Sequence, residues 1–156
     1  MELTAVNRQS NFSKSYTYKE FEYNTPIEIS EGSKIKHQVA IIGAGPIGLT
    51  LAIDLAQRGV KSVVLDDNNI VSTGSRAICW AKKTLEIFNR IGIADKIIDK
   101  GITWEVGRLF NGDDEVYSFN LLPEKGHKFP AFVNLQQYYV EEFLIEKCLE
   151  LSNFID

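Results

Sequence analysis

The sequence lacks a long apolar run, because Gly, Asp, Lys and Arg interrupt every hydrophobic stretch. None reaches the roughly 20 residues that a helix needs to cross a bilayer, so we expect no membrane-spanning segment. Positive charge is not in excess either. The net charge of -4 gives no general attraction to nucleic acid or anionic lipid. The first residues show no basic segment followed by an apolar one, so we expect no secretory signal.

Cysteine and histidine are scarce. Cys79 and Cys148 are isolated thiols without the CxxC spacing of metal or redox sites, so we expect no metal site. We expect both thiols to be buried and reduced, which fits a cytoplasmic location. The sequence places no acid or nucleophile beside His37 or His127, so we assign no catalytic residue.

Residues 1–36 are polar and show no steady hydrophobic period, which predicts an extended arm. Tyr16, Tyr18, Phe21 and Tyr23 are expected to pin part of this arm onto a surface. Pro26 is expected to exclude a helix there. We predict that residues 37–156 form the folded domain.

A strand–turn–helix–strand pattern begins at Val39. Residues 39–42 form a short apolar run bounded by glycine, which is typical of a strand buried on both faces. Apolar residues then recur at helical spacing up to Gly59, a natural stop for a helix. A second buried strand over 61–65 ends in two aspartates. The fold class is therefore α/β, built on a Rossmann-like βαβ unit.

Beyond this unit the pattern predicts three helices, an inserted antiparallel hairpin and the beginning of another strand. The helices are expected over 77–91, 94–100 and 135–151, the hairpin strands over 104–110 and 115–120, and the last strand from 154. Two parallel strands, few helices and a hairpin make a poorly enclosed sheet. We therefore expect an incomplete domain, the first part of a larger protein.

Gly43, Gly45 and Gly48 form a G-x-G-x-x-G motif between the first strand and the helix. Gly43 allows the tight turn, and a side chain at Gly45 would collide with a pyrophosphate. Gly48 lets the helix lie close to the strand. The free N–H groups at the start of the helix then face anionic phosphates. The motif predicts a dinucleotide site.

Asp66 ends the second strand, 23 positions after Gly43. At this spacing a carboxylate can accept hydrogen bonds from a ribose diol. It also disfavours a 2′-phosphate, because two negative groups would meet, so Asp66 argues against NADP at this site while NAD and FAD remain. Asp67 is a second candidate, although only one of the pair should point at the ribose.

Three segments resemble the N-terminal portion of the class A FAD-dependent aromatic monooxygenases, in particular the 3-(3-hydroxyphenyl)propionate and phenol hydroxylases. The first is Gly43–Ala52, with Pro46 and Ile47 after the second glycine. The second runs from Gly74 through Arg76 to the Ile91-Gly92 pair, and the third is Phe132–Glu141. The resemblance covers nearly the whole chain.

The resemblance implies FAD as the cofactor. It places Arg76 near the pyrophosphate and ribityl chain and Gln137 within reach of the flavin's linker. A guanidinium offers paired donors to phosphate oxygens, which agrees with that role. The complete set of predicted cofactor-binding residues is Gly43, Gly45, Pro46, Ile47, Gly48, Asp66, Asp67, Arg76 and Gln137.

The resemblance also implies a reaction. NADH or NADPH reduces FAD, and the reduced flavin reacts with O₂ to hydroxylate a small, phenol-like aromatic substrate. Two later family motifs, Asp-Gly and Gly-Asp, have no counterpart, because Gly112-Asp113 falls in the predicted hairpin turn. We therefore expect the chain alone to be inactive. An NAD-dependent dehydrogenase or reductase domain and a non-catalytic dinucleotide-binding fragment remain alternatives. The residues do not determine the substrate, the nicotinamide donor or the oligomeric state.

Overall fold

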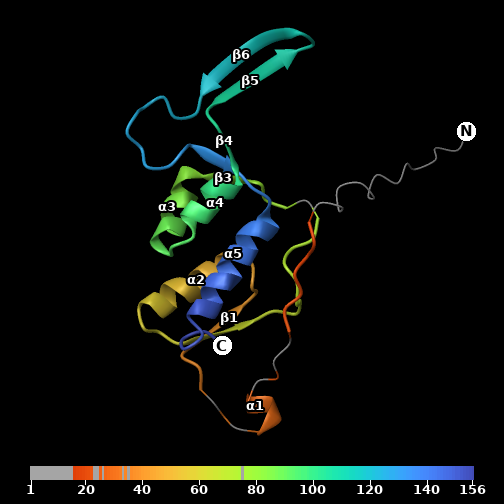
Figure 1. Ribbon diagram of the computed structural model, residues 1–156, viewed down its shortest axis with the longest axis vertical. Helices are drawn as coiled ribbons and strands as arrows, with labels where there is room; N and C mark the ends of the chain where they lie inside the picture. The colour runs from red at the N-terminus through yellow and green to blue at the C-terminus, as the bar shows by residue number, and fades with distance from the viewer. Residues whose placement is uncertain (1–15, 23–24, 26, 33, 35, 75) are drawn as a thin grey trace, which may run out of the picture.

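The computed structural model describes residues 16–22, 25, 27–32, 34, 36–74 and 76–156 (Figure 1). Tyr23 and Pro26, which carried predictions for the arm, lie outside these residues. The elements in chain order are α1 (Ile27–Ser30), β1 (Val39–Ile42), α2 (Pro46–Gln57), β2 (Ser62–Leu65), β3 (Cys79–Ala81), α3 (Lys82–Arg90), α4 (Ala94–Lys100), β4 (Ile102–Trp104), β5 (Val106–Asn111), β6 (Asp114–Asn120), β7 (Phe132–Asn134) and α5 (Gln137–Glu150).

The predicted βαβ unit is present. β1 and β2 pair in parallel, with Ile41 opposite Val64. Pro46 occupies the first turn of α2, where its missing N–H costs no hydrogen bond. Gly59 follows the helix with a φ of 75°, a backbone conformation that favours glycine after a helix end. The apolar face of α2 packs against β1, β2 and α5.

One face of the parallel pair is open, so the expectation that both strands are buried on both faces is wrong. Ile41 is buried on the α2 side. Ile42 and Leu65 point to the opposite side, where 79% and 45% of their surfaces are exposed. Alternate residues of a strand face opposite sides of the sheet, and the described residues cover only one of them.

The end of the chain adds to the parallel sheet. Ser62 N–H donates to the Phe154 carbonyl at 2.9 Å, and Asp156 N–H donates to the Ser62 carbonyl at 3.0 Å. Ser62 and Ile155 form a parallel bridge. The expected approach to a further strand from residue 154 is thus present as a single parallel bridge at Ile155, along the edge of β2 that β1 leaves free.

A three-stranded antiparallel sheet of order β3-β7-β4 replaces part of a predicted helix. The expected helix over 77–91 is wrong for its first residues, because Cys79–Ala81 pairs with β7 and α3 begins only at Lys82. This pairing is non-local and overrides the local helical spacing. Cys79 lies on this strand and is exposed, which corrects the expectation of a buried thiol, whereas Cys148 is buried.

β5 and β6 form the predicted antiparallel hairpin, which projects from the rest of the chain at the top of Figure 1. Gly112 occupies its turn with a φ of 62°. Trp104, expected to begin the first hairpin strand, instead ends β4 and stacks on Phe132 of β7.

The core lies where α2, α3, α4 and α5 meet the β3-β7-β4 sheet. On α5, the side chains of Val140, Leu144 and Cys148 are buried against this core. No helix within the described ranges is long and apolar enough to span a bilayer.

The arm is not extended throughout. α1 forms a single turn at Ile27–Ser30, so the expectation that Pro26 excludes a helix is wrong for the residues that follow it. Proline fixes φ at a helical value and disrupts only turns that precede it. Farther upstream, Tyr16 contacts Tyr138 and Tyr139 of α5, so part of the arm is pinned as expected. The division into an arm and a domain near residue 36 stays a prediction.

Candidate dinucleotide-binding site

The glycine turn joins β1 to α2 at very close range. Gly43 has a φ of 101°, and its N–H donates to the Leu65 carbonyl at 2.8 Å. A Cβ on Gly48 would lie 2.0 Å from the Gly43 carbonyl oxygen and 3.2 Å from the Ile41 side chain. The absence of a side chain at Gly48 therefore allows the helix to start directly against the strand, as the motif predicts.

Gly45 faces open space. It caps α2 in an extended conformation, and a Cβ placed on it would meet no atom within 4 Å. No side chain caps the helix and no acidic residue lies in its first turn. The start of α2 is therefore open to an anionic group, which the positive end of the helix dipole favours.

Asp66 lies at the end of β2 beside the glycine turn. Its carboxylate accepts hydrogen bonds from Ala44 N–H at 2.6 Å and Asn68 N–H at 2.9 Å. The Ala44 bond is the main cause that lowers the pKa of Asp66, so the group stays ionised at neutral pH. An ionised carboxylate at this position can accept further hydrogen bonds from ribose hydroxyls.

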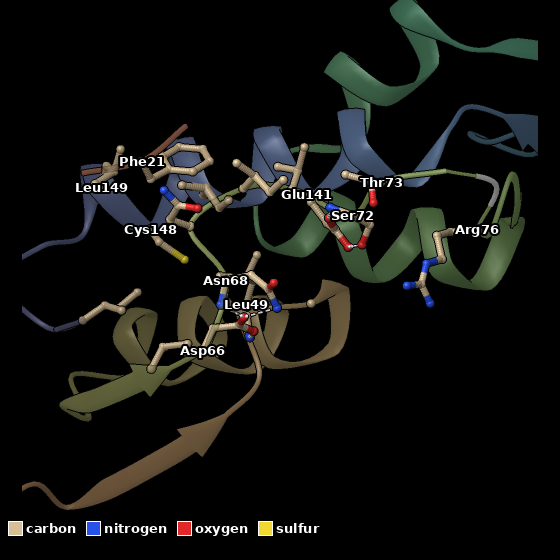
Figure 2. A pocket seen from close by; sticks show the side chains of 18 residues that line it. Phe21, Leu49, Asp66, Asn68, Ser72, Thr73, Arg76, Glu141, Cys148 and Leu149 are labelled. Carbon is tan, nitrogen blue, oxygen red and sulfur yellow. Dashed lines mark hydrogen bonds between the residues drawn. The ribbon is translucent and has the colours of Figure 1, made fainter. Parts of the chain in front are cut away.

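A cavity of about 430 Å³ connects these groups (Figure 2). Gly45 and Asp66 line it from the βαβ unit, and Arg76 lines it from the loop between β2 and β3. Arg76 is exposed and has no hydrogen-bond or ion-pair partner within the described part of the chain. Three of the predicted residues are thus brought to one cavity, and the guanidinium remains available to an anionic ligand.

The other predicted residues do not line this cavity. Pro46 and Ile47 border a separate groove between α2 and α3. The Asp67 carboxylate accepts a hydrogen bond from the Asn68 side chain at 2.8 Å. Their direct contacts with a cofactor stay predictions.

Gln137, at the start of α5, is bound to protein at both ends of its amide. Its oxygen accepts from Ala77 N–H at 3.2 Å. Its nitrogen donates to Glu141 at 2.7 Å and to the Ser72 hydroxyl at 3.1 Å. These contacts hold the loop that carries Arg76, while the predicted contact of Gln137 with a flavin linker stays a prediction.

Glu141 is a site residue that the sequence reasoning missed. Only 3% of it is exposed, yet its carboxyl group accepts from the Ser72 N–H and the Ser72 hydroxyl, each at 2.6 Å. It also lines the cavity. The sequence did carry a signal for this role. Glu141 lies one turn after Gln137, among the apolar residues of α5, and a charged residue in such a position is rarely buried without partners.

Removing the Glu141 carboxyl group is expected to destabilise the chain. In Glu141→Ala the partly buried Ser72 N–H loses its acceptor, at a cost of about 2–3 kcal/mol and a melting temperature lower by roughly 5–10 °C. Glu146→Ala on the same helix breaks only a partly exposed ion pair with Lys96 and should cost less than about 1 kcal/mol. Equal melting temperatures for the two variants would contradict this role.

The ionised state of Asp66 predicts a pH dependence. Because folding lowers its pKa, its contribution to stability is present above the unfolded pKa of about 4 and is lost as the pH falls through the folded value. Wild type should therefore melt above Asp66→Asn at pH 7, and the gap should close toward pH 3. Thermal melts between these values test this, with Asp67→Asn as the neighbouring control. A gap independent of pH would refute it.

Known proteins are similar to this chain over most of its length. The family described as "FAD binding domain" matches residues 36–152. A flavin-dependent monooxygenase of Mycobacteroides abscessus is 30% identical over 126 residues, which cover 76% of this chain and 26% of that protein. A 3-(3-hydroxy-phenyl)propionate/3-hydroxycinnamic acid hydroxylase of Mycobacterium sp. (strain JLS) is 28% identical over 59% of this chain and 16% of its own length.

A solved structure shares the fold. The p-nitrophenol 4-monooxygenase PnpA from Pseudomonas putida DLL-E4 superposes with a TM-score of 0.68 at 25% identity, over 76% of this chain and 31% of that one. The chain therefore spans 26% of the length of the first of these relatives, 16% of the second and 31% of the third. Since the family match extends over most of the sequence and over the whole glycine turn, the chain belongs to the FAD-binding domain family of flavin-dependent monooxygenases.

Proposed function

We propose that this chain supplies the adenosine and pyrophosphate half of the FAD site in an NAD(P)H-dependent monooxygenase that hydroxylates a small, phenol-like aromatic substrate with O₂. The observation that carries the proposal is the convergence of Gly45, Asp66 and Arg76 on one cavity. Two matched relatives support the substrate class, since one is named a 3-(3-hydroxy-phenyl)propionate/3-hydroxycinnamic acid hydroxylase and the other a para-nitrophenol 4-monooxygenase. We place this activity in the cytoplasm.

Each residue has a separate task in holding the cofactor. The open space before Gly45 and the amides at the start of α2 receive the pyrophosphate. The Asp66 carboxylate accepts hydrogen bonds from the adenosine ribose. The Arg76 guanidinium neutralises phosphate charge from the opposite wall of the cavity. Bound FAD supplies the redox chemistry, taking electrons from NADH or NADPH and using O₂ to oxygenate an aromatic ring.

The proposal is tested by cofactor binding. The purified 156-residue chain is titrated with FAD and, separately, with NAD⁺, and binding is followed by flavin absorbance and calorimetry. We expect binding of FAD, and no hydroxylation of phenolic substrates, because the described cavity offers groups for the adenosine half only. Binding of NAD⁺ without FAD would overturn the proposal in favour of a nicotinamide-dependent dehydrogenase.

A further inference from the structure

The N-terminal arm brings an aromatic side chain into the cofactor cavity. Phe21 lines the cavity together with Leu149 and Cys148 of α5. In Figure 2 these three side chains lie at one end and Arg76 lies at the other, with Asp66 between them. A segment that precedes the βαβ unit in the sequence therefore contributes to its ligand cavity.

The arm is held against the loop that follows β2. Phe21 N–H donates to the Asn69 carbonyl at 2.8 Å, and Glu20 forms an antiparallel bridge with Ile70. Gly74 N–H donates to the Tyr18 hydroxyl at 3.3 Å. Figure 1 shows the two segments running side by side. These contacts fix the backbone on which Phe21 is carried.

A second attachment ties the arm to α5. The Tyr16 hydroxyl donates to Glu142 at 3.2 Å, and its ring centre lies 4.1 Å from that of Tyr138. Burial of this hydroxyl beside Glu142 raises the pKa of Tyr16. Because the arm is bound to both walls of the cavity, Phe21 is positioned by the folded protein before a ligand arrives.

The order of groups in a dinucleotide indicates which part of the ligand would lie at the Phe21 end of the cavity. With the pyrophosphate at Gly45 and the ribose at Asp66, the base lies beyond Asp66 and away from Arg76. The side chains of Phe21 and Leu149 supply an aromatic ring and an aliphatic surface there. The Cys148 thiol, whose pKa burial raises to about 12, is uncharged in this setting. Such a wall suits a flat heteroaromatic base.

We infer that Phe21 forms the wall against the adenine ring of FAD, and that residues 16–21 act as a strap that holds this wall in place. The inference rests on the proposed FAD site and deepens it. It gives the arm a role in cofactor affinity that the glycine turn and Asp66 do not supply.

The test compares cofactor affinities of Phe21 variants. FAD and ADP-ribose, which share the adenosine diphosphate half, are titrated calorimetrically into the full chain. Phe21→Ala should weaken both ligands roughly five- to thirty-fold, as loss of one base–aromatic contact does elsewhere. Phe21→Tyr keeps the ring and should bind within about twofold of wild type. Phe110→Ala, on the exposed hairpin strand β5, is the matched control and should bind as wild type does.

Phe21→Leu separates loss of the aromatic ring from loosening of the arm, because leucine keeps apolar volume without a flat ring. It should also bind FAD about fivefold more weakly. Wild-type affinity in both Phe21→Ala and Phe21→Leu would overturn the inference and leave the FAD site intact. Failure of the wild-type chain to bind FAD would instead overturn the proposed function itself.

Discussion

Gly45→Val is expected to abolish FAD binding while the chain stays folded. The valine side chain would occupy the space before α2 that the pyrophosphate requires. Losing two or more charge-assisted hydrogen bonds of roughly 1.5–3 kcal/mol each should lower affinity about 100-fold or more. Calorimetric titration with FAD measures the loss.

The same substitution should leave stability unchanged, because no protein atom lies within 4 Å of the new Cβ. The extended backbone at Gly45, with a φ of -78°, also accepts a β-branched residue. We expect a melting temperature within a few degrees of wild type. FAD affinity equal to that of wild type would show that the turn has only a structural role.

Gly48→Ala is expected to lower the stability of the fold strongly, whereas Gly45→Val is expected to lower only the affinity for FAD. Its methyl group would lie 2.0 Å from the Gly43 carbonyl oxygen, which is backbone and cannot rotate away. α2 must then move off β1, where Ile41 packs. We expect a cost of about 3 kcal/mol or more, at the upper end of overpacking effects.

Urea unfolding of Gly48→Ala measures this loss, and Gly45→Ala is the matched control. Both variants add one methyl group to the same turn, but only the methyl at position 48 meets protein atoms. The control should unfold at the wild-type midpoint. Similar midpoints for the two variants would show that α2 does not depend on the close approach to β1.

The spacing of residues within the βαβ unit was enough to predict the glycine turn and its acidic partner. The glycine spacing, the helix up to Gly59 and the carboxylate at Asp66 all follow from the period of one βαβ unit. The structure joins its two ends directly, since Ala44 N–H donates to Asp66 across 22 positions of sequence. The regular connection between a parallel strand, its helix and the next strand makes such a contact predictable.

Contacts between distant segments could not be predicted in the same way. Cys79–Ala81 has neighbours with helical spacing, yet it pairs with β7 more than 50 positions later. Glu141 and Ser72 are 69 positions apart, and no local period relates them. The exposed face of β1 and β2, with Ile42 79% exposed, contradicts a strand pattern that predicts burial on both sides. An apolar strand pattern indicates that both faces of the strand need to be covered, but it does not indicate which segment of the protein covers each face.

The sequence by itself determined the glycine turn, its acidic partner and the class of ligand, because main-chain geometry and the size of each side chain decide whether a phosphate fits there. Only the tertiary structure decided which other residues share the cavity. Arg76 and Glu141 both line it, and Gln137 and Glu141 hold the loop that carries Arg76. Phe21 arrives from the arm. These placements depend on packing between segments far apart in the chain, for which no spacing rule exists.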